Sequence, residues 1–189
     1  MVLLATLRHG DTAWSAEGRI QGRSDVPLSD AGRLAVQSVR LPKICAEMRV
    51  ITSPLARCVE TAALLGAPQA AREPRLIETS WGEWEGRRLA EVREELGAAM
   101  AQNEARGWDF RPAGGESPRE VLARVRSWLA ELSVPTLAIT HRGVIRAIYA
   151  AAAGWDLRGK PPAKLDWGAL QLFRLGADGT PAIEQLNLR

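Results

Sequence analysis

Short apolar runs that alternate with helical patterns constrain the fold of this chain more than any other feature. The apolar runs lie at 2–7, 49–53 and 135–140, and they have the length and composition of strands in a sheet covered on both faces. Helical patterns lie at 29–41, 53–66, 117–132 and 144–153. Because strands that alternate with helices are typical of α/β proteins, we predict a three-layer α/β sandwich with a mostly parallel central sheet flanked by helices.

Local signals predict where these helices begin. Ser29, Ser53 and Ser117 are suitable N-caps, because a serine hydroxyl accepts a hydrogen bond from a free N–H of the first turn. Pro54 supports a start at Ser53, since proline is favoured at the first helical position. Ser117 and Glu120 have the spacing of a capping box. The spacing in 29–41 predicts one packed face, formed by Leu34, Ala35, Ser38 and Val39.

The remaining segments add two features. Residues 169–188 alternate like an antiparallel hairpin around a turn at 176–181. Residues 72–115 are richer in charge and tryptophan than the rest, and no linker divides the chain. We therefore expect one domain over 1–189, with a partly helical insertion at about 72–115 that lies over the edge of the sheet.

Composition narrows the class of protein. Arginine supplies nearly all the positive charge, but the net charge is only +3 and the arginines are scattered, which argues against nucleic-acid binding. Cys45 and Cys58 are the only cysteines and, without a secretory leader, they indicate reduced thiols. No stretch approaches the length of a membrane span. We expect a cytoplasmic protein that binds neither nucleic acid nor a membrane.

Polar residues gather where the apolar runs give way to helices. Arg8 and His9 end the first run, Arg57 lies just beyond the second, and His141 follows the third. Because ligands of open α/β sheets bind at the carboxyl ends of the strands, we expect these side chains to meet there. Guanidinium groups and helix N-termini attract anions, and neutral imidazole is a nucleophile. The junctions therefore predict a phosphoryl pocket; the plainer alternative is that both histidines are structural.

Several other kinds of site are absent from the sequence. Two histidines and two distant cysteines are too few for a zinc site. The phosphate-binding motif G-x-x-x-x-G-K-[ST], the dinucleotide motif G-x-G-x-x-G and the G-x-S-x-G turn of serine hydrolases are all missing. We expect neither a metal nor a cofactor.

Five blocks together carry a resemblance to a known family. LRHGDTAW with GRIQGRSDVPLSDAGR resembles the RHG segment of the histidine phosphatase superfamily, the phosphoglycerate-mutase-like proteins. TSPLARCVETA is similar to the second arginine-bearing segment, and LIETSWGEWEG to the acid-bearing segment. GGES resembles the loop that precedes a helix, and THRGVIRA the segment with the second histidine. The blocks follow the family order from about residue 3 to residue 148, so the resemblance is specific.

The resemblance implies a role for each of five residues. His9 would be the nucleophile that becomes phosphorylated, while Arg8, Arg57 and His141 would hold and neutralise the phosphoryl oxygens. Glu78 would be the general acid for the leaving oxygen, because an alkoxide leaves poorly without a proton. From the residues alone, Glu83 and Glu85 compete for this last role, and all three glutamates could instead line a solvated loop.

Further positions are expected to bind phosphate or substrate. Gln21, Gly22 and Gly143 lie in the matching blocks, and Gly143 would let the backbone approach closely. Ser15 stands where the family usually has asparagine, so a phosphate-contacting amide is shortened to a hydroxyl. Arg142 replaces the first glycine of the usual His-Gly-Gly. Its side chain either points away from the pocket or adds charge at the rim, which would favour a substrate with a second anionic group.

The resemblance implies a metal-independent phosphomonoesterase that hydrolyses a small phosphorylated metabolite through phosphohistidine, with the insertion over the active site. A phosphoglycerate mutase dependent on 2,3-bisphosphoglycerate would use the same residues. The short interval between Glu78 and His141 favours the small bacterial phosphatase branch, in which α-ribazole 5′-phosphate is one candidate substrate. A non-catalytic member that binds a phosphorylated ligand is the third possibility. We expect a monomer or a homodimer.

Overall fold

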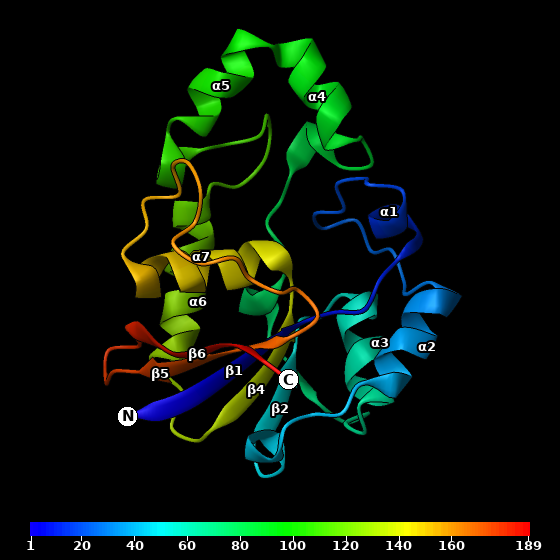
Figure 1. Cartoon of the computed structure of the whole chain (residues 1–189), viewed down its shortest axis with the longest axis vertical. Helices are drawn as coiled ribbons and strands as arrows, with labels where there is room; N and C mark the ends of the chain where they lie inside the picture. Colours follow the sequence, from blue (N-terminus) through cyan, green and yellow to red (C-terminus); the bar gives the residue numbers. More distant parts are fainter.

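The computed structural model describes residues 1–189 and contains one six-stranded sheet (Figure 1). Its order is β3-β2-β4-β1-β5-β6, and the four strands from β3 to β1 are parallel while β5 and β6 are antiparallel. The strands are β1 (Val2–Arg8), β2 (Arg49–Thr52), β3 (Ala71–Arg72), β4 (Thr136–Thr140), β5 (Leu170–Leu175) and β6 (Pro181–Leu188). The predicted mostly parallel α/β sheet is confirmed.

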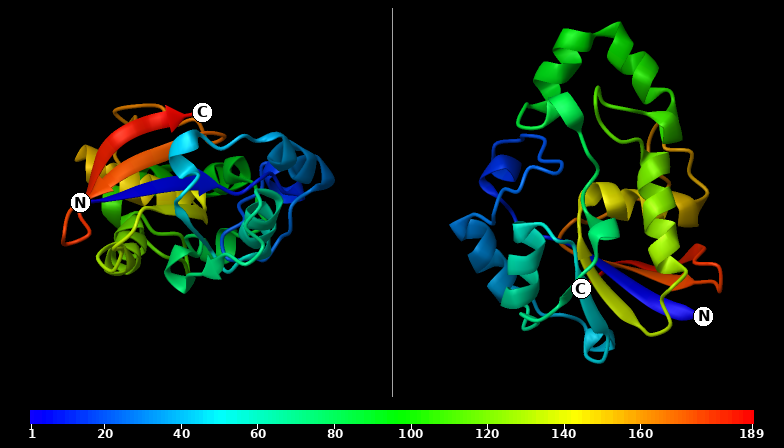
Figure 2. Two further views of the ribbon diagram at one scale, coloured as in Figure 1. Left: turned by 90° about the horizontal axis from the view of Figure 1, so that it is seen from below. Right: turned by 180° about the vertical axis from the view of Figure 1, so that it is seen from behind.

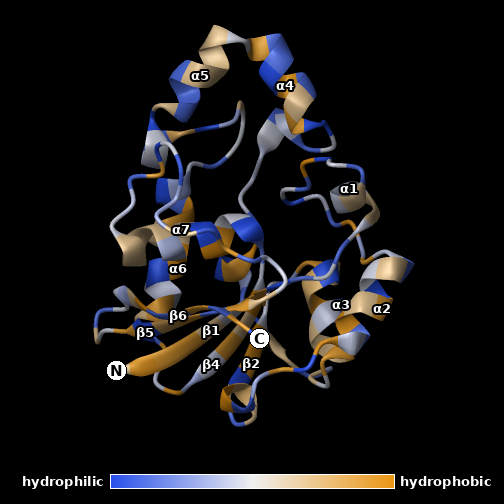
Figure 3. Ribbon diagram, in the orientation of Figure 1, coloured by the Kyte–Doolittle hydropathy of each residue, from blue (hydrophilic) through white to orange (hydrophobic).

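Helices cover both faces of this sheet. Leu4 and Ala138 point to a large core shared with α6 (Pro118–Leu129) and α7 (Arg142–Ala153). The next residues along the same strands point the other way, as successive residues of a strand must. On that side Ile139 packs against α3 (Ala56–Leu64), and α2 (Asp30–Ser38) lies against α3. The result is the three-layer sandwich; the strands are its most hydrophobic part in Figure 3.

The segment between β3 and α6 projects beyond the carboxyl edge of the sheet. It contains α4 (Leu89–Leu96), α5 (Ala98–Glu104) and the 3-10 turns η2 (Pro74–Leu76), η3 (Gly82–Trp84) and η4 (Gly107–Asp109). Figure 2 shows α4 and α5 as an arch that stands apart from the sheet. The arch has its own small core of Trp84, Val92 and Met100. We call residues 82–110 the cap. The short helix α1 (Ala13–Ala16) lies near its base, and the turn η1 (Lys43–Cys45) precedes β2 (Figure 1).

Two expectations about the helices were wrong. Leu34 is 68% exposed, and the buried residues of α2 are instead Gly32 and Val36. A Cβ on Gly32 would lie 2.0 Å from the carbonyl oxygen of Asp11, so glycine lets α2 pack directly against that loop. Helix α3 begins at Ala56 with Leu55 as its N-cap, not at Ser53. The hydroxyl of Ser53 is engaged elsewhere, as described below.

Other local predictions are confirmed. Ser117 caps α6 in a capping box with Glu120, which bonds back to the Ser117 N–H. Helix α7 ends at Gly154 in the left-handed conformation, with φ at 63°. The antiparallel hairpin is β5 and β6. No helix has both the length and the apolar character needed to cross a membrane.

Candidate active site

The register between β1 and β4 brings the two histidines together. Arg8 lies opposite Thr140 across the parallel pair, and the His9 N–H donates to the Thr140 carbonyl over 3.0 Å. His9 and His141 therefore follow adjacent strand ends, and their ring centroids are 5.1 Å apart. The structure thus places both predicted histidines at the carboxyl edge of the sheet, where open α/β folds bind ligands.

His9 is held as a neutral imidazole in one tautomer. Its Nδ1 lies 2.7 Å from the carbonyl oxygen of Gly10. A carbonyl only accepts hydrogen bonds, so Nδ1 carries the proton and Nε2 carries the lone pair. Burial, together with the positive charges of Arg8 and Arg57, holds the pKa of His9 well below its ordinary value. A neutral ring with a free Nε2 is the form that acts as a nucleophile.

His141 is completely buried and has two polar neighbours from the β2–α3 region. Its Nε2 lies 2.7 Å from the hydroxyl of Ser53 and 3.4 Å from the sulfur of Cys58. Burial lowers the pKa of His141 well below its ordinary value, and the positive charges of nearby arginines act in the same direction. Burial also raises the pKa of the Cys58 thiol, so this cysteine is a neutral packing neighbour.

Two arginines supply fixed positive charge beside the histidines. Arg57 is fully buried on α3, and its terminal nitrogens donate to the carbonyls of Ser24 at 2.9 Å and Gly22 at 2.7 Å. Arg8 donates to Asp11 over 3.3 Å. The Nε groups of both arginines are buried and have no hydrogen-bond acceptor in the protein. Because an unsatisfied buried donor is costly, these two groups favour an anionic ligand with free oxygens.

Glu78 is buried beside the N-terminus of α7. Its Oε1 accepts from the N–H of Thr79 at 2.8 Å and from the N–H of Gly143 at 3.1 Å. A Cβ at residue 143 would lie 2.4 Å from that oxygen and 2.2 Å from Thr79 Oγ1, so only glycine fits. Burial raises the pKa of Glu78 above its ordinary value, although the two backbone N–H groups oppose the change. The site therefore favours a protonated carboxyl here.

The other two candidate acids lie in different surroundings. Glu83 is exposed on the turn η3. Glu85 accepts from the N–H groups of Arg23, Ser24 and Trp81 and from the hydroxyl of Ser24. Burial alone would raise its pKa, but these hydrogen bonds outweigh it and hold the pKa below its ordinary value. Glu85 is thus an ionised structural carboxylate, in contrast to Glu78, whose pKa is raised.

The remaining predicted positions take three different places. The Ser15 hydroxyl bonds to Asp11 and Thr12 at the start of α1. Gln21 has a buried Oε1 with no donor in the protein, and Gly22 has a φ of 55° and offers its carbonyl to Arg57. Arg142 is exposed, and its guanidinium stacks on the ring of Trp167 at 4.5 Å from the centroid.

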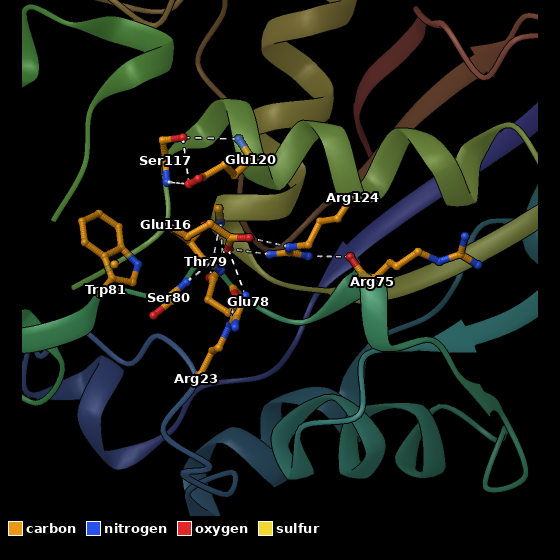
Figure 4. Close-up of polar contacts among 12 residues, drawn as sticks. Arg23, Arg75, Glu78, Thr79, Ser80, Trp81, Glu116, Ser117, Glu120 and Arg124 are labelled. Carbon is orange, nitrogen blue, oxygen red and sulfur yellow. Dashed lines mark hydrogen bonds and ion pairs between the residues drawn. The ribbon is translucent and has the colours of Figure 1, made fainter. Parts of the chain in front are cut away.

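Sequence reasoning missed several residues that support this site. Thr61 accepts the N–H of Gly10 at 3.1 Å, and Ser53 contacts His141. Glu116 and Arg124 hold the segment that carries Glu78 (Figure 4). The GGES block pointed to Glu116, but nothing in the sequence linked it to Arg124, which lies eight residues further along the chain and within α6. No group of three or more His, Cys, Asp or Glu side chains is placed to hold a metal ion.

Comparisons with known proteins agree with this arrangement. The family model for the histidine phosphatase superfamily (branch 1) matches residues 4–189. Glucosyl-3-phosphoglycerate phosphatase of Mycobacterium tuberculosis is 32% identical over 82% of this chain and 79% of its own length. A 2,3-bisphosphoglycerate-dependent phosphoglycerate mutase of Gloeobacter violaceus is 29% identical over 95% of this chain and 89% of its own length.

Solved structures of the same family resemble this chain as well. The mycobacterial glucosyl-3-phosphoglycerate phosphatase superimposes with a TM-score of 0.77 at 27% identity, covering 100% of this chain and 99% of that chain. The chain belongs to the histidine phosphatase superfamily. Within that family it is a phosphoric monoester hydrolase that acts on a small phosphorylated substrate.

Proposed function

We propose that His9 and Glu78 hydrolyse a small phosphate monoester in two steps through phosphohistidine. The observation that carries the proposal is a pair of opposite pKa shifts in two buried side chains that both lie close enough to Arg57 to respond to its charge. The pKa of His9 is lowered, so its ring stays neutral, and the pKa of Glu78 is raised, so its carboxyl keeps a proton. Opposite pKa shifts of this kind suit a pair in which one group is the nucleophile and the other is the general acid.

In the first step the lone pair of His9 Nε2 forms a bond to phosphorus. The bond between phosphorus and the ester oxygen breaks, and that oxygen takes the proton of Glu78 as the alcohol leaves. In the second step Glu78, now a carboxylate, takes a proton from water while the water oxygen attacks phosphorus. The P–N bond breaks, inorganic phosphate leaves, and His9 and Glu78 return to their starting forms.

The other site residues act by charge and position. The transferring phosphoryl group is anionic and loosely bonded, so neutralising its oxygens is the main contribution available to the protein. Arg8 and Arg57 each keep a buried Nε donor for this purpose, and Arg57 is fixed by two backbone carbonyls. The ring of His141, centred 5.1 Å from that of His9, would supply a further polar contact to the phosphoryl group.

Arg142 gives the site a preference for substrates with a second anionic group. It directly follows His141, and it forms no ion pair or hydrogen bond within the protein. A guanidinium that stacks on an aromatic ring keeps its in-plane N–H groups free for a carboxylate or a phosphate. The relatives named for glucosyl-3-phosphoglycerate and phosphoglycerate act on acids of this kind. We therefore place the substrate among phosphorylated carboxylic acids.

A panel of phosphate monoesters tests the reaction. Purified protein is assayed in chelator against an aryl phosphate, 3-phosphoglycerate, phosphoserine, glucosyl-3-phosphoglycerate, sugar phosphates, nucleotides and α-ribazole 5′-phosphate. Release of inorganic phosphate from a small ester, absent in His9→Ala, is the expected result. Isomerised phosphoglycerate with little free phosphate would identify a mutase instead. No turnover of any compound would favour the alternative of a non-catalytic protein that binds a phosphorylated ligand.

A matched pair of substrates tests the role of Arg142. The ratio of kcat/KM for 3-phosphoglycerate to that for glycerol 3-phosphate, which lacks the carboxylate, is compared between wild type and Arg142→Gln. We expect the ratio to fall about tenfold or more in the variant. The substitution removes a charge-assisted contact to the carboxylate, which 3-phosphoglycerate has and glycerol 3-phosphate lacks. An unchanged ratio would mean that Arg142 only packs against Trp167.

A further inference from the structure

The segment that carries Glu78 is held at its two ends by Glu116, just before α6, and by Arg124, in the middle of α6. Residues 75–80 contain only the end of the turn η2 and no other regular element, so their shape depends on contacts with other segments. At one end, Arg124 donates to the carbonyl of Arg75. At the other, the Ser80 N–H donates to Glu116 Oε2 at 3.4 Å, and the Glu116 N–H donates to the Ser80 carbonyl at 2.8 Å (Figure 4).

Glu116 and Arg124 are joined to each other as a two-pronged ion pair. Arg124 Nε lies 2.9 Å from Glu116 Oε1, and Arg124 Nη2 lies 3.1 Å from Glu116 Oε2. The side chain of Arg124 is only 17% exposed and that of Glu116 only 13%, so solvent screens their charges little. Arg23 joins the network from the opposite side, with hydrogen bonds to Glu116 Oε2 at 3.3 Å and to the Glu78 carbonyl at 3.4 Å.

We propose that the Glu116–Arg124 ion pair positions Glu78 for proton transfer; this inference rests on the proposed role of Glu78 as the general acid. The Glu78 carboxyl bonds only to backbone N–H groups, those of Thr79 and Gly143. Its placement over Gly143 therefore depends on where the backbone of 75–80 lies. The ion pair contacts that backbone at both ends, at the Arg75 carbonyl and the Ser80 N–H, and the Thr140 hydroxyl holds the Leu76 carbonyl between them. Proton transfer is sensitive to such placement, because donor and acceptor must lie within hydrogen-bond reach.

The choice of an ion pair has an electrostatic reason as well. A lone arginine behind Glu78 would favour the ionised carboxylate and remove the proton that the reaction needs. Arg124 does act on Glu78 in this direction. The negative charge of Glu116 acts on Glu78 in the opposite direction to Arg124, while both side chains keep their hydrogen bonds to the segment. The ion pair thus holds Glu78 in position without favouring its ionised form.

Leaving-group dependence tests the proposal, since only proton donation to the leaving oxygen distinguishes alkyl from aryl phosphates. In Glu116→Gln we expect kcat for an alkyl phosphate to fall about tenfold or more and kcat for an aryl phosphate to fall less than about threefold. KM and the inhibition constant for inorganic phosphate should stay unchanged, which also reports that the variant is folded. Glu184→Gln is the matched control, because it removes a similar two-pronged pair, with Arg174, in the hairpin of β5 and β6 outside the cap. It should change neither rate.

A double-variant cycle excludes a general loss of stability. If the pair acts through Glu78, adding Glu116→Gln to Glu78→Gln should lower the alkyl rate by less than about twofold. Arg124→Gln should reproduce the loss seen with Glu116→Gln. Arg124→Lys should recover only part of the rate, because an ammonium group cannot reproduce the planar two-pronged bond to Glu116 together with the bond to the Arg75 carbonyl.

The possible failures point to different conclusions. If Glu116→Gln slows alkyl and aryl phosphates equally, or if its effect adds fully to that of Glu78→Gln, the pair is a structural brace and the inference is wrong. In that case the leaving-group effect of Glu78→Gln itself would remain, and the proposed function would stand. If Glu78→Gln shows no leaving-group effect, the acid assignment fails first.

Discussion

The carboxyl edge of the sheet and the cap are built in different ways. At the edge, His9, Arg57, Glu78 and His141 are each at most 8% exposed, and most of their hydrogen bonds go to the backbone of neighbouring elements. The edge rests on α6 and α7, which share a core of 19 buried residues. The cap has a core of three buried residues, and its arginines form ion pairs on the surface, such as Arg93 with Glu104.

We expect this difference to separate the chemistry from the choice of substrate. Backbone contacts in a large core fix the reacting groups to within a small distance, as catalysis requires. Exposed ion pairs add about 0–1 kcal/mol each, so the cap holds its shape through little more than its small core. We infer that changes in the cap alter which ester is accepted, whereas changes at the edge remove the reaction itself.

The largest expected effect is at the edge. His9→Ala removes the atom that bonds to phosphorus, so turnover of every substrate should fall by about 10³-fold or more, including aryl phosphates. A ³²P-labelled substrate should label the wild-type protein in an acid-labile form and leave the variant unlabelled. Labelling of His9→Ala would mean that another residue is the nucleophile.

Glu78→Gln should give the next largest effect and should depend on the substrate. General acid catalysis contributes about 10²–10⁴-fold where the leaving group is poor, so alkyl phosphates should be affected most. Aryl phosphates leave with less help and should lose much less. In the wild type, activity on alkyl phosphates should fall as pH rises through the raised pKa of Glu78. In the glutamine variant this decrease of activity with pH should be absent. Equal losses on both substrates would contradict the assignment.

Matched valine substitutions compare the two regions directly. Val92 in the cap and Val125 in the main core are both fully buried on helices. Valine to alanine should cost about 2 kcal/mol at either site, from lost burial and the cavity left behind. Val125→Ala should lower the free energy of global unfolding. Val92→Ala should speed hydrogen exchange within 82–110 and leave hydrolysis of a small aryl phosphate unchanged. A full loss of global stability in Val92→Ala would show that the cap is not separable.

The smallest expected effect is the pH dependence of the free energy of unfolding, which arises from the histidines at the carboxyl edge of the sheet. The pKa values of His9 and His141 are lower in the folded state, so below about pH 6.5 the unfolded chain binds protons that the folded chain does not. The free energy of unfolding should therefore fall as pH drops, by about 1.4 kcal/mol for each unit of pKa depression that is titrated. Glu78 acts in the opposite sense, because its pKa is raised. Urea unfolding at pH 7 and pH 5 measures this, and His9→Asn should reduce the difference.

Local patterns determined much of this protein without the structure. The apolar runs and the capping box at Ser117 predicted strands and a helix that the fold contains, because strand burial and helix capping depend on near neighbours. The strand-to-helix junctions likewise predicted that His9 and His141 meet, since parallel strands bring their carboxyl ends to one edge. The family blocks pointed to Glu78 among three glutamates.

Tertiary structure decided what depends on distant partners. The sequence did not indicate that Leu34 faces solvent, because the close approach of Gly32 to Asp11 turns α2. It suggested Ser53 as a helix cap, but that hydroxyl lies against His141. The raised pKa of Glu78 and its link to Glu116 and Arg124 arise from burial and contacts between segments far apart in the chain. Such burial and charge are set by packing in three dimensions, which no local pattern contains.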